Sequence, residues 1–273
     1  MSAIPEIRPG QSIELLKELH ILTRDGKLNQ DSRRKLKQVD HLLHFIEPLL
    51  GELVTNGDSL AVADHGAGKS YLGFILYDRY FKGRSDGHIY GVETRQELVE
   101  HSRSLAIRLG FSRMSFVNLR VENAIDSPEL PARVGMVTAL HACDTATDDA
   151  IRFALHRQAR YVVLVPCCQA EVARVLRSRK NESLSKTPLS EIWRHPIHTR
   201  EFGSQLTNAL RCLQLEAQGY QLTVTELVGW EHSLKNELII ARHTGAPRSN
   251  AAKRLEEILH ALNLDELHDR FLY

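Results

Sequence analysis

The 273-residue sequence has few of the features that mark secreted, membrane or strongly charged proteins. It contains four cysteines, two of them adjacent at Cys167 and Cys168, which does not suggest a disulfide framework and predicts a reducing, cytoplasmic setting. No apolar run approaches the roughly 20 residues of a membrane helix, and residues 1–11 lack the apolar core of a signal peptide. The formal net charge of +1 gives no overall field that would attract nucleic acid, so any basic surface must be local.

A glycine-spaced turn follows the first apolar strand of the sequence. The strand predicted over 59–63 runs into Asp64 and a turn with Gly66 and Gly68, and a second apolar run ends in Glu93. Glycines let the backbone approach a ligand closely, and a carboxylate at a strand end can accept both ribose hydroxyls. Hydrogen bonds to a charged acceptor contribute about 1.5–3 kcal/mol each. The pairing predicts a pocket for a nucleoside that carries positive charge or no phosphate.

Three other interpretations of this turn stay open. Residues 63–70 fit a relaxed P-loop, with alanine in place of the first glycine. Asp64 would however place a negative charge where a P-loop holds phosphate, and the strand over 134–140 reaches Asp144 only after three intervening residues. A dinucleotide-binding turn would need a third glycine, which is missing. A purely structural turn would leave the acidic residues at two equivalent strand ends without a role.

The order of apolar patterns predicts an α/β fold. Strands alternate with helical patterns, which implies a doubly wound, seven-stranded, mostly parallel sheet that ends in an antiparallel pair. Thr94 and Glu97 form a capping box, and Thr145 and Asp148 are expected to cap the following helix. The predicted strands cover 59–63, 89–93, 114–117, 134–140, 161–165, 221–228 and 237–242, and predicted helices cover 12–23, 31–50, 71–77, 94–110, a segment from 145, 202–218 and parts of 247–273.

This pattern divides the chain into an N-terminal helical region (1–52), a central domain (53–245) and a C-terminal helical extension (246–273). In an open α/β sheet, ligands bind beyond the carboxyl ends of the strands. Asp64 and Glu93 are expected there, together with the segments that follow the fourth and fifth strands. Sequence-distant polar residues are thereby predicted to converge on one site.

Three segments carry a resemblance to a known family: 64–72, 140–148 and 166–169. Over about residues 35–243, the chain resembles class I S-adenosylmethionine-dependent methyltransferases. Within them it is similar to the branch that holds the tRNA acceptor-stem ribose methylases and the methyltransferase-like proteins related to glutathione-S-transferase-C-terminal-domain-containing proteins. The resemblance implies a Rossmann-like fold and S-adenosylmethionine as the cofactor. This ligand carries a sulfonium cation and no phosphate, which agrees with the pocket expected at the glycine turn.

The resemblance also assigns roles around the cofactor. Asp64 is expected near its ammonium end, Gly66 and Gly68 beside its methionine part, and Glu93 at its ribose. His65 is also counted among the cofactor-binding residues.

Further residues complete the expected pocket. Glu122 and Asn123, after the third strand, are candidates for reading the adenine edge, and a surface role for Glu122 is equally open. His141 and Ala142 are expected to line the methyl-donor side. Lys69 is expected to face solvent, because a lysine in the first turn of a helix gains nothing from the helix dipole.

Two acidic residues are candidate bases, since an oxygen nucleophile must lose a proton near the transition state. They are Asp144 and Asp148, just beyond the fourth strand, although Asp148 could serve only as a helix cap. Ribose methylases of another branch use a Lys-Asp-Lys-Glu set, of which Asp144 and Glu237 would fill two places. The fifth strand ends without a lysine, so this chain departs from that set.

Cys167 and Cys168 leave three roles open. Some RNA cytosine-C5 methylases attack the base with a cysteine placed after the fifth strand, and the start of a helix could lower the thiol pKa as this requires. With His141 and Cys143 the pair could hold zinc, although adjacent cysteines rarely bind one tetrahedral ion well and the usual spacing is absent. We treat both cysteines as walls of the pocket and predict no metal site.

RNA is the expected substrate, because the N-terminal segment is locally basic and the resembling branch modifies tRNA. Lysine and arginine side chains that neutralise phosphates bind RNA in a salt-dependent way, and the alternative is a solvated helix face. Trp193, in a polar stretch over 177–200, could stack on a base or pin that stretch to the core. The basic residues are Arg24, Lys27, Arg33, Arg34, Lys35 and Lys37.

The predicted function is therefore a cytoplasmic S-adenosylmethionine-dependent methyltransferase that acts on tRNA or rRNA and has no membrane partner. The alternatives are a protein or small-molecule methyltransferase of the same fold, a cofactor-binding scaffold without catalytic activity and, more remotely, a P-loop nucleotidase.

Overall fold

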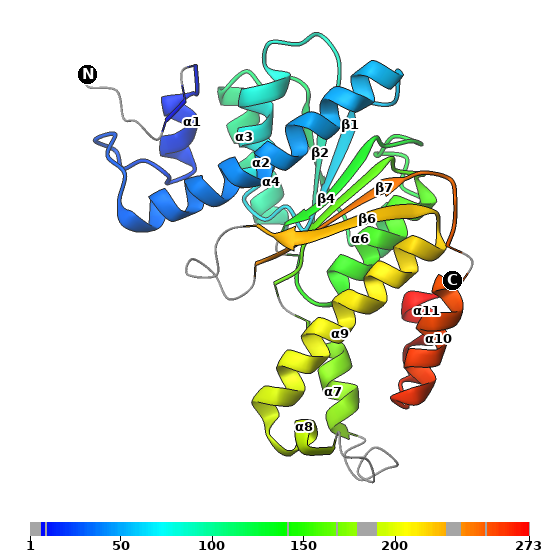
Figure 1. Cartoon of the computed structure of the whole chain (residues 1–273). Coiled ribbons are helices and arrows are strands. Elements are labelled where there is room, and N and C mark those ends of the chain that lie inside the picture. Colours follow the sequence, from blue (N-terminus) through cyan, green and yellow to red (C-terminus); the bar gives the residue numbers. More distant parts are fainter. Residues whose placement is uncertain are drawn as a thin grey trace.

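The computed structural model describes residues 7–8, 10–140, 142–167, 169–178, 190–227, 236–248 and 250–272. His141, Cys168 and the middle of the polar stretch over 177–200 lie outside these ranges. One sheet has the strand order β3-β2-β1-β4-β5-β7-β6 (Figure 1). The strands are β1 Ala61–His65, β2 His88–Glu93, β3 Met114–Asn118, β4 Met136–Leu140, β5 Tyr161–Val165, β6 Tyr220–Glu226 and β7 Glu237–His243.

The sheet confirms the predicted doubly wound, seven-stranded α/β fold. Strands β1 to β5 run parallel, while β7 is antiparallel to β5 and β6 is antiparallel to β7. The strand order reverses at β1, which pairs with β2 on one side and with β4 on the other. Ligands of open α/β sheets bind at such a switch point. The carboxyl ends of β1 and β4 therefore define where the site is expected.

The helices follow the predicted order, with differences in their bounds. The first predicted helix shortens to six residues, begun by Ser12, whose hydroxyl accepts from the Leu15 N–H. Helix α9 starts at Pro196, not at residue 202, and a short helix α8 precedes it. The helices are α1 Ile13–Glu18, α2 Gln30–Asn56, α3 Tyr71–Leu76, the π-helix η1 Tyr77–Phe81, α4 Gln96–Arg108, α5 Val121–Ala124, α6 Thr145–His156, α7 Glu171–Ser178, α8 Ser190–Arg194, α9 Pro196–Ala217, α10 Ala251–Ala261, the 3₁₀ helix η3 Asp265–Leu267 and α11 His268–Phe271.

Helices cover both faces of the sheet, because alternate residues of a strand point to opposite faces. On β5, Tyr161, Val163 and Val165 belong to the core that includes residues of α2, α3 and α4. Val162 and Leu164 belong to the opposite core, which includes residues of α6. Five apolar residues in a row therefore suit β5, as the sequence predicts.

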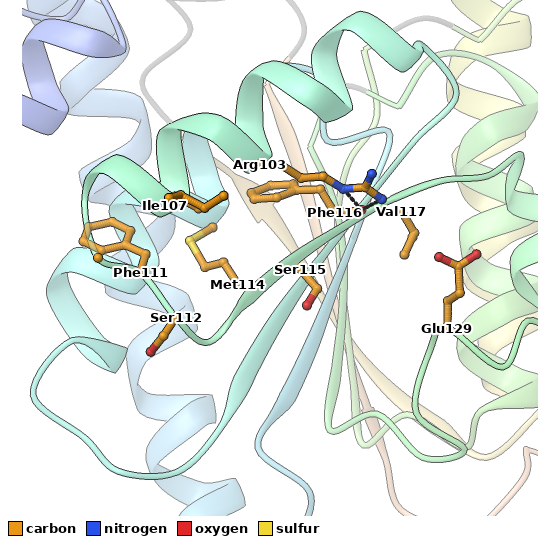
Figure 2. A pocket seen from close by; sticks show the side chains of 11 residues that line it. Arg103, Ile107, Phe111, Ser112, Met114, Ser115, Phe116, Val117 and Glu129 are labelled. Atoms are coloured by element: carbon orange, nitrogen blue, oxygen red, sulfur yellow. Dashed lines mark hydrogen bonds between the residues drawn. The ribbon is translucent and has the colours of Figure 1, made fainter.

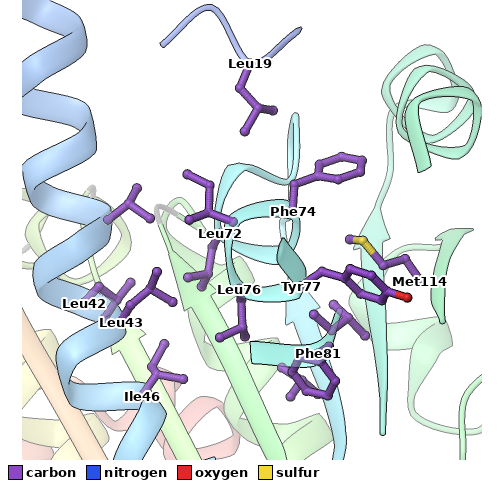
Figure 3. Close-up of a cluster of buried hydrophobic side chains, with 14 of the residues drawn as sticks. Leu19, Leu42, Leu43, Ile46, Leu72, Phe74, Leu76, Tyr77, Phe81 and Met114 are labelled. Atoms are coloured by element: carbon purple, nitrogen blue, oxygen red, sulfur yellow. The ribbon is translucent and has the colours of Figure 1, made fainter. Parts of the chain in front are cut away.

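Helix α2 runs six residues beyond its predicted end, through Pro48. Its apolar spacing continues to Leu53, which is fully buried in the same core as Leu43 and Ile46. In Figure 3, the labelled α2 side chains face those of α3 and η1 across this core. The helix ends at Gly57, whose φ of 70° gives the left-handed cap that glycine favours. Burial of the continuing apolar stripe outweighs the proline.

Both predicted helix caps are wrong. The first residue before α4 is Arg95, without a side-chain cap bond, and Thr94 donates its N–H and hydroxyl to Glu93 instead. The cap position of α6 is Asp144, and the carboxylate of Asp148 binds Arg211. At α6 the carboxylate of Asp148 is bound by a residue 63 positions away, whereas at α4 the adjacent Glu93 takes the donors of Thr94.

The C-terminal helices pack against α9 around a separate apolar cluster. Trp193 lies in this cluster at 3% exposure, with its ring 5.1 Å from that of Phe202. Its burial favours the pinning role over stacking on a base. No helix within the described ranges is long and apolar enough to cross a membrane.

Candidate functional site

The glycine turn between β1 and α3 approaches the loop after β4. Gly66 and Gly68 have φ values of 64° and 57°, in the left-handed region. A Cβ on Gly66 would lie 3.3 Å from the Cβ of Ala142, tighter than an ordinary contact. The fold thus brings Gly66 and Ala142 together. Lys69 is exposed, as predicted.

Glu93 ends β2 and closes the other side of the turn. Its Oε2 accepts from the Gly68 N–H at 2.8 Å, and its Oε1 accepts from Nε of Arg95 at 3.1 Å. The N–H groups of Thr94 and Arg95 donate to Oε1 as well. Burial by itself would raise the pKa of Glu93, but the bonds from Arg95 and Gly68 outweigh it and lower the pKa. The carboxylate is therefore ionised and held at the strand end.

Asp64 lies beneath the same turn, at 3% exposure. It receives a hydrogen bond of 2.7 Å from the hydroxyl of Thr138 on β4, which pairs beside it. Burial raises the pKa of Asp64 to about 7, and the Thr138 bond opposes this shift. The carboxyl group consequently changes charge near neutral pH, and a cation nearby would favour its ionised form.

His65 is fully buried beside Asp64, with its ring 4.4 Å from that of Phe153. Neither ring nitrogen has a hydrogen-bond partner among the described residues, and the same holds for the hydroxyl of Ser70. Burial lowers the pKa of His65 to about 3, so the ring is neutral. Two buried polar groups without partners thus flank the glycine turn.

These features fit the cofactor that the resemblance implies. Asp64 and Glu93 supply carboxylates at the ends of paired strands, and the turn between them is built from small residues. A cationic adenosyl ligand suits two carboxylates, whereas a triphosphate would be repelled by them. His65 and Ser70 offer polar atoms that are otherwise unpaired.

Asp144 joins the loop after β4 to the start of α7. Its Oδ1 accepts from the N–H groups of Ala170 and Glu171, at 2.9 and 3.1 Å. Its backbone has φ 49° and ψ −124°, a strained conformation for a residue other than glycine. The candidate base is therefore a half-buried carboxylate with one oxygen fixed by a helix start.

Asp148, the second candidate base, is 4% exposed on α6. Arg211 of α9 donates Nε and Nη2 to its two oxygens, at 2.6 and 2.9 Å. To act as a base, Asp148 would first have to release this guanidinium. Glu237, at the start of β7, accepts a bond of 2.7 Å from the side chain of Asn208 on α9.

The thiols of Cys143 and Cys167 meet across the loops after β4 and β5, with their sulfur atoms 3.7 Å apart. Cys143 is exposed and Cys167 half-buried. The other members of the suggested zinc set, His141 and Cys168, lie outside the described residues. Within the described ranges, no group of three or more histidine, cysteine, aspartate or glutamate residues could hold a metal ion.

Glu122 and Asn123, the candidates for adenine contacts, lie in the one-turn helix α5 after β3. The side chain of Glu122 is exposed and 3.6 Å from the guanidinium of Arg120. This placement suits the surface role that the sequence leaves open for Glu122.

A cavity of about 650 Å³ lies along β3, the edge strand, and α4 (Figure 2). Arg103 of α4 lines it and donates Nε to the carbonyl of Phe116 at 2.9 Å. Ile107 and Glu129 also line it, but none of the predicted site residues does. The cavity is thus separate from the strand-end site.

Sequence reasoning misses four residues of the site. Thr138 and Arg95, which hold Asp64 and Glu93, lie inside a strand and just after one, without a motif of their own. Arg211 and Asn208 stand among apolar residues of α9. A lone arginine in such a buried stretch is the one signal available, since charged residues are almost never fully buried unless paired.

A family model described as "Methyltransferase domain" matches residues 34–175, which is more than half of the chain. No curated protein sequence matches the chain significantly. Among solved structures, an rRNA methylase from Streptococcus thermophilus is 11% identical, with 74% of this chain and 95% of that chain covered and a TM-score of 0.43. Magnesium protoporphyrin IX methyltransferase from Synechocystis PCC 6803 with bound SAH is 15% identical, with 85% and 95% covered and a TM-score of 0.46.

A methyltransferase from Podospora anserina is similar at 12% identity, with 85% of this chain and 88% of that chain covered and a TM-score of 0.46. The matched range 34–175 contains the glycine turn, Glu93 and Asp144. The chain therefore belongs to this methyltransferase family, and it is an S-adenosylmethionine-dependent enzyme.

Proposed function

We propose that this methyltransferase acts on RNA and holds its cofactor between Asp64 and Glu93. The observation that supports the cofactor site is the placement of two carboxylates on either side of a glycine turn, at the ends of paired strands. In this proposal Glu93 accepts the ribose hydroxyls and Asp64 lies nearest the ammonium group of the methionine part. Gly66 and Gly68 leave room for the methionine part, beside Ala142.

S-adenosylmethionine, when bound, supplies an activated methyl group, and the protein supplies orientation and a base. We assign the base to Asp144, because the helix start of α7 fixes its Oδ1 and leaves the carboxylate oriented at the loop after β4. Asp148 would act through Arg211 instead. Cys143 and Cys167 would form a wall of the acceptor site.

RNA as the substrate is supported by the exposed basic segment near the N-terminus. Arg24 lines a groove of about 480 Å³ together with Lys17 and Glu18 of α1 and with Asn29, which precedes α2. Arg24, Lys27 and Lys37 are all exposed. Positive side chains beside a groove suit a phosphate backbone, whose contacts dominate the affinity for nucleic acid.

The finer assignments follow the resemblance. We propose membership in the branch of the tRNA acceptor-stem ribose methylases and their methyltransferase-like relatives, with tRNA or rRNA as the target and the cytoplasm as the location.

We also propose the domain division into 1–52, 53–245 and 246–273. Limited proteolysis tests the division, since cuts inside 53–245 before cuts near its ends would contradict it.

The labelled transfer of methyl groups tests the function. The purified protein is incubated with labelled S-adenosylmethionine and with RNA, protein and metabolite fractions from a strain that lacks it. We expect label in the RNA fraction. Label in protein or metabolites alone would replace RNA as the substrate. No label, despite binding of S-adenosylhomocysteine, would favour a scaffold.

Two further measurements extend this experiment. Calorimetry with Mg-ATP tests the P-loop alternative, because a protein that binds ATP but not S-adenosylhomocysteine would overturn the cofactor site. Cys167→Ser should retain most of the transfer if the thiol is a wall. Complete loss of transfer with intact cofactor binding would support a covalent route through this cysteine.

A further inference from the structure

Arg211 is a fully buried arginine in the middle of α9. Its guanidinium has three partners: Nε and Nη2 donate to the carboxylate of Asp148, Nη2 also donates to the carbonyl of Asp144 at 2.9 Å, and Nη1 donates to Asn208 at 3.2 Å. Only arginine has a planar guanidinium group that can donate to several acceptors at fixed angles. The side chain therefore ties α9 to α6 and to the loop after β4.

The carbonyl that Arg211 holds belongs to the strained residue of that loop. Asp144 has a backbone conformation with φ 49° and ψ −124°, which the surrounding structure must enforce. On its other side, the carboxylate of Asp144 accepts the N–H groups of Ala170 and Glu171. Asp144 is thus held from two directions, by Arg211 through its carbonyl and by α7 through its carboxylate.

The same helix also holds the loop after β5. Asn208, one turn before Arg211, accepts a bond of 3.0 Å from Nε2 of Gln169. Ser204 donates its hydroxyl to Oε1 of Gln169 at 2.7 Å, and Asn208 donates to Glu237 at 2.7 Å. The bond from Gln169 to Asn208 is buried, and the bond from Ser204 to Gln169 is partly buried. Three residues on one side of α9 therefore anchor two loops and the start of β7.

Close helix packing makes these bonds possible. Gly203 of α9 lies against Ala173 of α7, so closely that a Cβ on the glycine would be 2.7–2.8 Å from atoms of Ala173. The absence of a side chain at this crossing lets Ser204 reach the segment between β5 and α7. Helices α7 and α9 lie side by side in Figure 1.

Stability alone does not account for a buried ion pair of this kind. Removing two charges from water is costly, and replacing a buried ion pair by apolar residues is often neutral or stabilising. The pair between Arg211 and Asp148 must therefore be judged by what it positions. The pair positions the backbone of Asp144, which is the base in the proposed function.

We propose that Arg211 is a positioning residue of the methyl-transfer reaction, acting through the carbonyl of Asp144. Asp148 orients the guanidinium, and Asn208 couples it to the loop after β5. This proposal rests on the proposed function, because it takes Asp144 as the base. It predicts that Arg211 affects the transfer step more than cofactor affinity.

The double variant Asp148→Ala/Arg211→Met separates positioning from charge balance. Removing both partners leaves no uncompensated charge, so the thermal midpoint should stay within about 4 °C of the parent. Methyl transfer should fall on the order of 10- to 100-fold, as expected for a slight misplacement of a reacting group. The affinity for S-adenosylhomocysteine should change less than about threefold.

Hydrogen exchange gives a readout that does not depend on activity. The amides of Ala170 and Glu171 donate to Asp144, so in the double variant they should exchange faster than in the parent. If the parent transfers no methyl group to any fraction, the proposed function fails, and this exchange still decides whether Arg211 positions Asp144. Parent-like exchange in the double variant would overturn the proposal, as would a parent-like transfer rate.

One variant serves as a control and a second as a replacement for the double variant. Arg113→Met removes an arginine that donates to the carbonyls of Gly87 and Phe81 at the opposite, amino-terminal edge of the sheet. It should lower the thermal midpoint without changing hydrogen exchange at Ala170 and Glu171.

If the double variant does not fold, Arg211→Lys replaces it. This variant keeps the charge opposite Asp148 but lacks the planar guanidinium group. We then expect a folded protein with faster exchange and slower transfer, and parent-like values in it would overturn the proposal.

Discussion

The N–H of Gly68 donates to Oε2 of Glu93 at 2.8 Å, so the glycine turn after β1 is tied to the end of β2. The same carboxylate carries Arg95, whose Nε and Nη2 lie 3.1 and 3.3 Å from its two oxygens. The Arg95 guanidinium thus occupies the place at Glu93 that the proposed function gives to the ribose hydroxyls. The Arg95 side chain is 60% exposed and can leave toward solvent.

The Arg95→Ala variant should therefore bind S-adenosylhomocysteine more tightly than the parent. An exposed ion pair contributes up to about 1 kcal/mol, so the gain should be about two- to fivefold. Isothermal titration calorimetry measures it. Arg108→Ala, which removes another exposed ion pair from α4, should leave the affinity unchanged. A tenfold loss in Arg95→Ala would instead make Arg95 a ligand of the cofactor.

The affinity for S-adenosylmethionine should rise with pH through the titration of Asp64. The pKa of this carboxyl group is raised to about 7 by burial, so the group loses its proton between about pH 6 and 8. Its ionised form attracts the cation, and binding below pH 7 should release a proton. Calorimetry in buffers with different ionisation enthalpies detects that proton. A proton release that Asp64→Asn leaves unchanged would contradict the assignment.

Asp64 and His65 should act on stability in opposite directions. The folded-state pKa of Asp64 is raised, so the folded state holds the extra proton between about pH 3.8 and 7 and gains stability as pH falls through this window. His65 has its pKa lowered to about 3, so the unfolded state takes up the extra proton below about pH 6.5 and stability is lost as pH falls.

Asp64→Asn removes the first of these effects and leaves the second. Its thermal midpoint, relative to the parent, should therefore fall as the pH is lowered from 7 to 5. Differential scanning calorimetry of the cofactor-free proteins measures the difference. The exposed Asp58, changed to asparagine, serves as the control. A midpoint difference that does not vary with pH would show that Asp64 is already ionised in the folded protein.

The fold follows from local patterns to a large extent. The apolar run over β5 and the residues that end β1 and β2 are visible in the sequence, because burial on both faces selects consecutive apolar residues. The convergence of Asp64 and Glu93 then follows from the parallel order of the strands. Helix α2 passes its predicted end at residue 50, because Leu53 continues the apolar stripe that packs on the sheet.

The partners of the site residues do not follow from local patterns. Asp148 reads as a helix cap, yet it binds Arg211, 63 residues away on α9. Thr94 and Glu97 read as a capping box, yet Glu93 takes the N–H and hydroxyl of Thr94. Tertiary packing brings the Arg211 donor to Asp148, whereas Thr94 donates to the carboxylate of the residue before it.

Binding of RNA should depend on the basic segment beside the N-terminal groove. Arg24→Ala/Lys27→Ala should weaken binding at low salt and reduce the slope of log affinity against log salt by about one to two, since each phosphate contact contributes roughly 0.7–0.9. Fluorescence anisotropy with tRNA measures this slope. Lys253→Ala/Arg254→Ala, on α10, removes the same charge elsewhere and should not change it. Equal slopes in both double variants would remove this segment from the interface.

The central claim is that Asp64 and Glu93 hold a cationic adenosyl cofactor, and titration with S-adenosylhomocysteine and S-adenosylmethionine tests it most directly. Glu93→Gln keeps the shape of the side chain and removes its charge, and it should weaken both ligands by about 10- to 150-fold. Asp64→Asn should also weaken both ligands, because S-adenosylmethionine and S-adenosylhomocysteine both carry the ammonium group near which Asp64 is expected. Glu97→Gln is the matched control. Parent-like affinities in folded Glu93→Gln and Asp64→Asn proteins would contradict the account.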